Sequence, residues 1–198
     1  MIAGVILAGG AGTRIGGDKA LVPFRGRTLI EAVIGRVQDQ VGELALSVPI
    51  ARVDAYRARL GMRFALLADS LPGDTGPLAG VVRGLEWARG TAKWLATFPC
   101  DTPFLPDDLV AQLMRDAPEA PVAARSEGRM HGVCAVWPVS CLERLRAGVV
   151  EEHWRSLHGA LDHLGGTIRD IACESEAFFN VNTPEDLARA EALAHDAV

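Results

Sequence analysis

The sequence predicts an α/β fold: a three-layer αβα domain on a mostly parallel, mixed sheet. Short apolar runs alternate with amphipathic stretches through the first half of the chain, an order typical of βαβ units. The first run, residues 3–8, is apolar throughout, as expected of a strand covered on both faces. With 198 residues and 49% hydrophobic content, the chain is long enough for one well-buried core.

The elements of the first half follow from local patterns. After the strand at 3–8, the segment TLIE (28–31) reads as a capping box with Thr28 at the N-cap. The helix that it opens repeats apolar side chains at Leu29, Val33, Val37 and Val41. Further strands are predicted at 43–48, 62–68 and 93–98, and further helices at 51–60, 76–90 and 106–117. Gly61 closes the first of these helices, and Pro77 and Gly90 mark the two ends of the second.

The pattern changes at residue 121. Two apolar runs flank the polar stretch 126–129, which predicts a hairpin or a long return loop. Helices at 139–147 and 151–164, a strand at 167–173, and a last helix opened by TPED then follow. Without a repeat or a linker, we expect one domain over 1–198.

Composition excludes several classes of function. The net charge of −5, without a dense lysine and arginine cluster, argues against nucleic acid and anionic membranes as partners. The four cysteines form no C-x-x-C pair, and the histidines at 153, 158 and 163 are five apart, which predicts reduced thiols and no histidine metal site. No signal peptide or span of roughly 20 apolar residues is present, so we expect a cytoplasmic protein.

The glycine-rich segment LAGGAGTRIGGDKAL (7–21) predicts a phosphate-binding loop of an unusual kind. It is not a nucleotide P-loop, because Asp18 stands where G-x-x-x-x-G-K-[ST] requires lysine. It is not a dinucleotide fingerprint either, because Ile15 stands at the third glycine. Glycines 9, 10 and 12 still allow close backbone approach to a polyanion, and Arg14 and Lys19 supply positive charge.

Two aspartates follow predicted strands. Asp69 ends the strand at 62–68, and Asp101 lies just past the strand at 93–98. Because the ends of parallel strands share one edge, where ligands bind, we expect both carboxylates beside the glycine loop. Either one alone could be a helix cap or turn residue. Asp101 is the better candidate for a functional residue, because Pro99 and Pro103 fix the turn around it and Asp107 and Asp108 already serve the next helix. One carboxylate plus phosphate oxygens commonly holds Mg²⁺, so Asp101 is the expected magnesium ligand.

Four segments carry a family resemblance: LAGGAGTRIGGDKAL, DSLPGDTGPLAG, FPCDTPFLP and FNVNTPEDL. In this order they resemble the MobA-type nucleotidyltransferases, the molybdenum cofactor guanylyltransferases. The resemblance implies a Rossmann-like glycosyltransferase-A type fold and Mg²⁺-dependent transfer of GMP from GTP to molybdopterin, with release of pyrophosphate. It also implies that the single domain has a nucleotide-binding half (about 1–110) and an acceptor-binding half (about 111–198). Contact with cofactor-delivery or acceptor proteins is a further expectation.

The resemblance also assigns roles to positions. Leu7, Ala8, Gly9, Gly10 and Gly12 would contact the nucleotide, Asp69 its guanosine part, Lys19 its phosphates and Asp101 the metal ion. Lys19 and Arg14 would stabilise charge as pyrophosphate leaves. On the acceptor side the candidates are His131, Asn180 and Asn182. The two asparagines could equally lie near the metal ion, or serve only as turn residues before the last helix.

The chain departs from the family at two places. Ser47 stands where an asparagine is common, and His131-Gly132 where a His-Pro pair is common. LAGG in place of the LAAG of cytidylyl enzymes favours guanine. The alternatives left open are a nucleotidyltransferase using CTP or another small phosphorylated acceptor, and a non-catalytic GTP-binding regulator.

Overall fold

The computed structural model describes residues 1–9, 18–68, 76–116 and 118–193. Among these residues, seven strands form one sheet in the order β5-β4-β1-β6-β8-β7-β9. Their bounds are β1 Ile2–Leu7, β4 Glu43–Val48, β5 Ala65–Ala68, β6 Trp94–Pro99, β7 Val122–Ser126, β8 Arg129–Pro138 and β9 Thr167–Asp170. The fold is α/β as predicted.

The sheet is parallel except at one strand. β1 pairs in parallel with β4 and β6, and β4 with β5. β8 runs antiparallel to both β6 and β7, while β7 and β9 are again parallel. The carboxyl ends of β1, β4, β5 and β6 therefore share one edge of the sheet, which is the edge predicted to bind the ligand.

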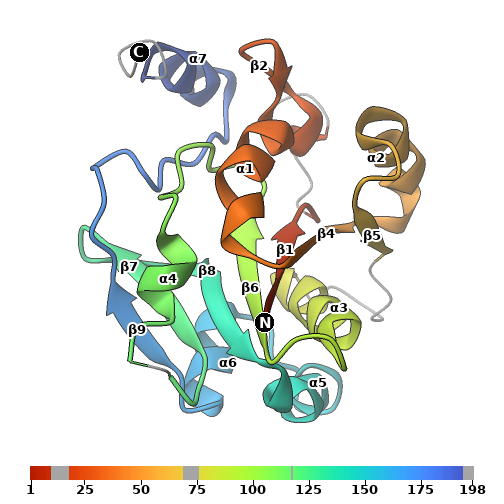
Figure 1. The fold of residues 1–198 in the computed structure, drawn as a ribbon, viewed down its shortest axis with the longest axis vertical. Helices are drawn as coiled ribbons and strands as arrows, with labels where there is room; N and C mark the ends of the chain where they lie inside the picture. Colours follow the sequence, from red (N-terminus) through yellow and green to blue (C-terminus); the bar gives the residue numbers. More distant parts are fainter. Residues whose placement is uncertain (10–17, 69–75, 117, 194–198) are drawn as a thin grey trace.

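Helices cover both faces of the sheet. Their bounds are α1 Leu29–Val37, α2 Val53–Leu60, α3 Pro77–Ala88, α4 Leu109–Leu113, α5 Leu142–Val150, α6 Leu157–His163 and α7 Pro184–Leu193. One buried cluster joins α1, α2 and α4 to the sheet, and a second joins α3, α5 and α6 to the other face. Figure 1 shows α1 and α4 in front of the sheet and α6 behind it.

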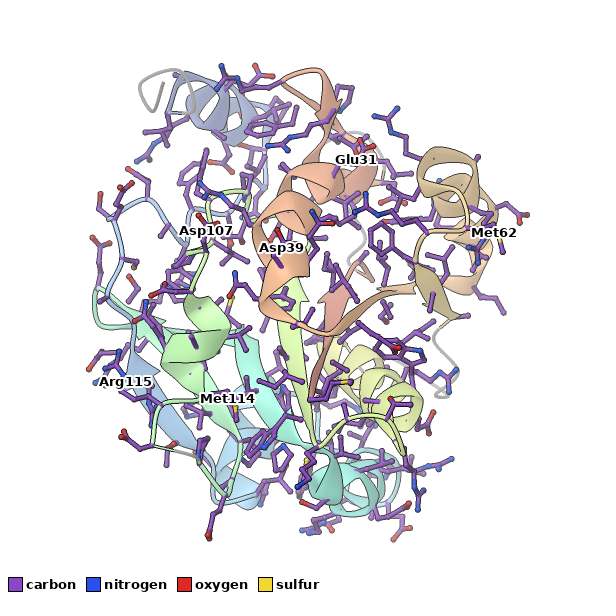
Figure 2. The ribbon with its side chains drawn as sticks, viewed as in Figure 1. Glu31, Asp39, Met62, Asp107, Met114 and Arg115 are labelled. Carbon is purple, nitrogen blue, oxygen red and sulfur yellow. The ribbon has the colours of Figure 1, made fainter. Side chains whose placement is uncertain are left out.

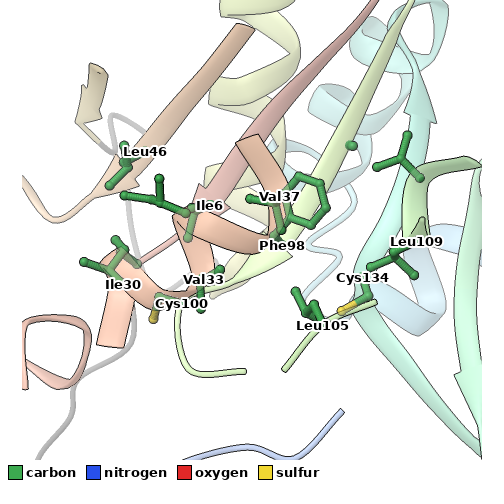
Figure 3. Packing of buried hydrophobic residues seen from close by; sticks show 14 of the residues in the cluster. Ile6, Ile30, Val33, Val37, Leu46, Phe98, Cys100, Leu105, Leu109 and Cys134 are labelled. Atoms are coloured by element: carbon green, nitrogen blue, oxygen red, sulfur yellow. The ribbon is translucent and has the colours of Figure 1, made fainter. Parts of the chain in front are cut away.

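Successive side chains of a strand point to opposite faces of the sheet and so belong to different cores. In β1, Ile6 belongs to the core under α1, whereas Val5 and Leu7 belong to the core under α3. Figure 3 shows Ile6 between Ile30 of α1 and the neighbouring strands. Burial on both faces explains why β1 is apolar throughout.

A third, smaller apolar cluster lies beyond the carboxyl edge of the sheet. It joins α1 and α7 to the hairpin of β2 (Pro23–Phe24) and β3 (Arg27–Thr28). Its buried members include Phe24, Leu29, Val181 and Ala190. The end of the chain is thereby packed beside the segment that follows the glycine loop.

Several predicted boundaries are confirmed. The strand at 43–48 matches β4, and the capping box at Thr28 is present, with the Thr28 N–H and hydroxyl each 2.7 Å from Glu31 Oε2. The polar stretch 126–129 is a hairpin turn, in which Glu127 (φ 51°) and Gly128 (φ 75°) are both left-handed. The last helix starts at Pro184, as predicted.

Three predicted helices are shorter than expected. The helix predicted to include Val41 ends at Val37, because a 3₁₀ turn at Gln38–Gln40 follows and Val41 is extended (φ −133°). The helix predicted at 151–164 begins only at Leu157, because His153 is left-handed (φ 59°) and the Ser156 hydroxyl caps the helix by accepting from Gly159 N–H. The helix predicted at 106–117 covers Leu109–Leu113, and Asp116 (φ 63°) stands just past its last turn. Arg169 Nη1 donates to the carbonyls of Gln112 and Leu113, so the freed carbonyls of that end are satisfied.

Smaller differences concern segment ends. The strand predicted at 62–68 starts at Ala65, and the one at 167–173 stops at Asp170. A 3₁₀ turn at Ile50–Arg52 precedes α2, and another at Val139–Cys141 precedes α5, which extends to Val150. In the described part of the chain, no helix is long and apolar enough to cross a bilayer.

Candidate functional site

Lys19 reaches the carboxyl edge of the sheet from a 3₁₀ turn, Lys19–Leu21. There its ammonium donates to Asp101 Oδ2, two residues past the end of β6. The same ammonium donates a 2.6 Å hydrogen bond to Asn182 Oδ1. Residues from the start, the middle and the end of the chain thus meet at one point.

This ion pair is only slightly open to solvent. The Lys19 side chain is 13% exposed and that of Asp101 18% exposed. Partial burial weakens screening by water, so the charges interact more strongly than a surface pair does. The site therefore presents one positive and one negative group in a poorly solvated place.

A short network ties the end of the chain to β6. The buried Thr102 hydroxyl donates a 2.6 Å hydrogen bond to Asn180 Oδ1 and lies 3.2 Å from Asp101 Oδ1. Val181 N–H donates to the Asp101 carbonyl over 2.9 Å. Because the backbone and the side chain of Asp101 are both held, its carboxylate is oriented before any ligand binds.

Asn182 is held by the start of α7. Asp186 Oδ2 accepts from the N–H groups of Asn182 (2.9 Å) and Thr183 (3.0 Å), and Asp186 N–H donates to Thr183 Oγ1. This is a capping box with an additional bond to Asn182. These bonds, above all the one from Asn182 N–H, hold the pKa of Asp186 below its usual value.

At the end of β1, backbone groups and not side chains face the candidate site. The Leu7 and Ala8 side chains are buried, and Ala8 N–H donates to the Ser47 carbonyl over 2.8 Å. Gly9 is exposed, and a Cβ on it would meet no atom within 4 Å. At the described end of this segment, open space therefore begins at Gly9.

Ser47 is buried and packs against α3. A Cβ built on Gly80 would lie 2.8 Å from Ser47 Oγ and 2.8 Å from a methyl group of Leu7. The serine that stands in place of the family's asparagine therefore belongs to the contact between β4 and α3.

His131 stacks on Phe178, with ring centroids 4.2 Å apart and an interplanar angle of 17°. Phe178 precedes Asn180 by two residues, so this acceptor candidate contacts the segment that carries the two asparagines. Burial, and to a lesser degree the positive charge of Arg129, lowers the pKa of His131 below its usual value. The ring is therefore neutral at pH 7.

Cys100 lies buried behind the ion pair. Its burial, with the negative charge of Asp101, raises the pKa of this thiol to about 12. Lys19 and Asp18 also act on this pKa, in opposite directions. Because a nucleophilic cysteine must be a thiolate, Cys100 is an inert part of the core.

Oxygen atoms for a metal ion are present. Asp101 supplies a carboxylate and Asn182 an amide carbonyl, the hard oxygen donors that Mg²⁺ prefers. The Lys19 ammonium donates to both of these oxygen atoms, so the two oxygens together accommodate a positive charge. Among the described residues, no three His, Cys, Asp or Glu side chains gather as a metal site. A metal ion held by Asp101 and Asn182 would take its other ligands from water or phosphate oxygens, as Mg²⁺ commonly does.

Four of the predicted site residues, Gly10, Gly12, Arg14 and Asp69, lie outside the described residues. Of the others, the structure brings together Lys19, Asp101 and Asn182 directly, and links Asn180 through Thr102. His131 joins them only through the segment of Phe178.

Sequence reasoning missed three residues of this network. Asp186 had a usable signal, because T-P-E-D is a capping pattern whose fourth residue reaches back. Thr102 and Tyr56 had none. Tyr56 on α2 donates a 2.8 Å hydrogen bond to Asp18 Oδ1, a contact between segments 38 residues apart.

Comparison with known proteins gives consistent results. Residues 4–164 match the family model of the MobA-like NTP transferase domain. The chain is 43% identical to a molybdenum cofactor guanylyltransferase of Cereibacter sphaeroides, covering 96% of this chain and 95% of the other. It is 40% identical to one of Mesorhizobium japonicum, covering 97% and 95%.

Solved structures share the fold. Molybdopterin-guanine dinucleotide biosynthesis protein A from Archaeoglobus fulgidus superposes with a TM-score of 0.80 at 22% identity, over 98% of this chain and 99% of the other. The 4-diphosphocytidyl-2C-methyl-D-erythritol synthase of Anaerococcus prevotii gives a TM-score of 0.78 at 13% identity, over 98% and 96%. The same fold thus occurs in proteins named for a guanine and for a cytosine nucleotide.

Proposed function

The chain belongs to the MobA-like NTP transferase family, and from this premise we propose that it transfers GMP from GTP to molybdopterin. The products are the guanine dinucleotide cofactor and pyrophosphate. Full-length relatives at 40–43% identity that bear the name molybdenum cofactor guanylyltransferase support the choice of nucleotide and acceptor. The single structural observation that carries the proposal is the contact of Lys19 with both Asp101 and Asn182.

The reaction is an in-line displacement at phosphorus. A terminal phosphate oxygen of molybdopterin forms the new bond to the α-phosphorus of GTP, and the bond from that phosphorus to the bridging oxygen of the β-phosphate breaks. The electron pair leaves with pyrophosphate. The attacking phosphate is already an anion, so no general base is required.

Lys19 stabilises the charge that builds on the departing pyrophosphate. Its ammonium is a mobile donor on a flexible stem, and both of its described partners are single oxygen atoms. When phosphates enter, they compete with Asp101 and Asn182 for this ammonium. We include Arg14 in the same role, together with the N–H groups of the glycine loop.

Asp101 and Asn182 are the proposed holders of Mg²⁺. The magnesium ion supplies positive charge to the phosphate oxygens when it is bound. Val181 holds the backbone of Asp101, and Asp186 holds the backbone of Asn182. The chain's own contribution is therefore positioning, which dominates in phosphoryl transfer.

The remaining assignments follow the family. The backbone of residues 7–12 and Asp69 hold the nucleotide, and His131, Asn180 and Asn182 face the acceptor. We place the reaction in the cytoplasm, because all four cysteines are free thiols.

An assay of pyrophosphate release with GTP, CTP, ATP or UTP, each with and without molybdopterin, tests this function. We expect release only with GTP and molybdopterin together, and only with a divalent cation. Equal release with CTP would mean a cytidylyl enzyme. If pyrophosphate were released from GTP only with a different small phosphorylated acceptor, that compound and not molybdopterin would be the acceptor. Tight GTP binding without any release would point to a regulator.

A further inference from the structure

Tyr56 is the single tyrosine of the chain, and it is fully buried. All eight residues of α2 are described, and Tyr56 alone of these is buried. Its ring packs in the core under α1, with Ile6, Ile30 and Leu46 in the same cluster. A phenylalanine would fill this place equally well, so packing alone does not explain the hydroxyl group.

The hydroxyl of Tyr56 is used for one contact. It donates a 2.8 Å hydrogen bond to Asp18 Oδ1. Burial and the neighbouring Asp18 carboxylate raise the pKa of Tyr56 above its usual value, so the hydroxyl keeps its proton and remains a donor. A hydrogen bond from a neutral donor to a carboxylate is among the stronger kinds in proteins.

Asp18 stands immediately before Lys19, at the start of the turn that carries it. The Asp18 carbonyl accepts from Leu21 N–H over 3.0 Å, and the Lys19 carbonyl accepts from Val22 N–H over 3.3 Å. Ala20, inside the turn, is buried. The backbone of Lys19 is therefore fixed on its C-terminal side by the turn, and on its N-terminal side by the side chain of Asp18.

Asp18 is the neighbour of Lys19 in the chain, and Asp101 is a partner of the Lys19 ammonium. The charges of Asp18, Asp101 and Lys19 all influence the pKa of the buried Cys100 thiol. The Tyr56 hydroxyl binds one of the two carboxylates. Without this bond, the Asp18 side chain would lose its described contact with α2, and the turn that carries Lys19 would lose the anchor on its N-terminal side.

We propose that Tyr56 is a positioning residue, which acts through Asp18 to direct the Lys19 ammonium toward Asp101 and Asn182. Helix α2 is then part of the site, although none of its residues needs to touch a substrate. For its effect on the reaction, this proposal rests on the proposed function. Its structural part does not.

The structural part is tested by nuclear magnetic resonance. The sequence holds just two lysines, Lys19 and Lys93. A protein labelled with ¹⁵N-lysine therefore gives two side-chain ammonium signals, one from the site and one from the exposed residue that precedes β6. We expect Tyr56→Phe to shift the Lys19 signal and to leave the Lys93 signal in place. Asp18→Ala is the second variant, with the same expectation.

A matched control loosens α2 without touching Asp18. Arg59 on α2 donates a 2.6 Å hydrogen bond to Glu31, and Figure 2 shows Glu31 on the side of α1 that faces α2. We expect Arg59→Ala to leave the Lys19 signal unchanged. An unshifted Lys19 signal in Tyr56→Phe, or an equal shift in Arg59→Ala, would overturn the proposal, whether or not GTP proves to be the substrate.

Kinetics test the consequence for the reaction. We expect Tyr56→Phe to lower kcat for pyrophosphate release about tenfold, as loss of a hydrogen bond to a charged group implies. KM for GTP should change far less. In a Lys19→Met background the same substitution should have no further effect, because the two residues act as one unit. Equal losses in both backgrounds would assign Tyr56 a merely structural role and refute the proposal.

Discussion

Lys19 and Asn182 are 163 positions apart in the chain, yet the ammonium of one donates a 2.6 Å hydrogen bond to the side-chain carbonyl of the other. The contact closes the site from both ends of the sequence, because Lys19 follows the glycine loop and Asn182 precedes α7. Asp101, after the central strand β6, lies between them and contacts Lys19. Changes in any of these three segments should therefore alter the same reaction.

Replacing Lys19 by methionine keeps the length of the side chain and removes its charge. We expect pyrophosphate release to fall on the order of 10²-fold, the usual effect of losing one contact to transition-state charge. Lys93→Met is the matched control, because Lys93 is exposed and precedes the opposite end of β6. A similar fall in both variants would contradict a role for Lys19 in the site.

Asp101→Asn should remove divalent-cation binding with little loss of fold. The backbone bond from Val181 N–H to the Asp101 carbonyl does not depend on the side chain, so the end of the chain should stay in place. We expect the electron paramagnetic resonance signal of Mn²⁺ to show loss of the bound ion in the presence of GTP, and transfer to cease.

Asp107→Asn is the control for this change. Figure 2 labels Asp107 in the segment before α4, where its carboxylate pairs with Arg36 on the surface. This variant should bind Mn²⁺ as the unmodified protein does. Retention of Mn²⁺ by Asp101→Asn would remove the metal assignment.

Asp186→Asn should destabilise the protein in a pH-dependent way. Its carboxylate stabilises the start of α7 and the backbone of Asn182, so we expect a loss of about 1 kcal/mol in the free energy of unfolding at pH 7. Because the pKa of Asp186 in the folded protein is below the usual 3.8, this stabilisation is complete above that value and is lost as the pH falls through the lowered one. Urea unfolding between pH 7 and pH 3 should show the two proteins converging only below about pH 4. A difference in stability independent of pH would argue against the carboxylate as its source.

Gly80→Ala should destabilise the protein although glycine is a poor helix former. A Cβ there would meet Leu7 and Ser47 at 2.8 Å, and overpacking of this kind costs about 1–3 kcal/mol. Gly35→Ala in α1 is the control, because its Cβ would approach only the flexible end of Arg27, at 3.3 Å. That substitution should stabilise the helix by up to about 1 kcal/mol. The unfolding temperatures of the two variants should therefore shift in opposite directions. A raised unfolding temperature in Gly80→Ala would contradict the prediction, because it would show that Leu7 and Ser47 can move to accept the added methyl group.

The pKa of His131 gives a further measurable quantity. Burial and the Arg129 charge lower it, so a proton titration followed by nuclear magnetic resonance should give a value below 6.5. Arg129→Gln should raise the pKa only partly, because burial remains. Since the folded state disfavours the protonated ring, stability contributed by neutral His131 should be lost as the pH falls below the usual histidine range. A pKa at or above 6.5 would mean that the ring is open to solvent.

The order of strands and helices could be predicted because each depends on local patterns. The apolar run of β1 and the capping box at Thr28 are both readable from neighbouring residues. The start of α6 and the end of α4 could not be predicted, because His153 and Asp116 adopt left-handed backbone angles. His and Asp adopt such angles more often than most residues, but too rarely for either residue to predict one by itself. The end of α4 also depends on Arg169 of β9, which donates to the carbonyls of Gln112 and Leu113 and is distant in the sequence.

Part of the site could likewise be predicted from the sequence. Lys19 follows the loop after the first strand, and Asp101 follows β6, so their meeting follows from the topology of a parallel sheet. Thr102 and Tyr56 have no such signal, because each is defined by a partner far away in sequence. The resemblance suggested Asn182 for the neighbourhood of the acceptor or the metal ion, and the structure brings it into contact with Lys19.

The position of Asn182 so late in the chain has a consequence for synthesis. A ribosome releases the glycine loop, Lys19 and Asp101 well before the segment that carries Asn180 and Asn182. Until that last segment emerges, Asp101 lacks the Val181 backbone contact, and Lys19 lacks one of its two oxygen partners. The parallel strands β1, β4, β5 and β6 can therefore pair before the segment of Asn180 and Asn182 has been made, and the contacts of that segment with Asp101 and Lys19 form only afterwards.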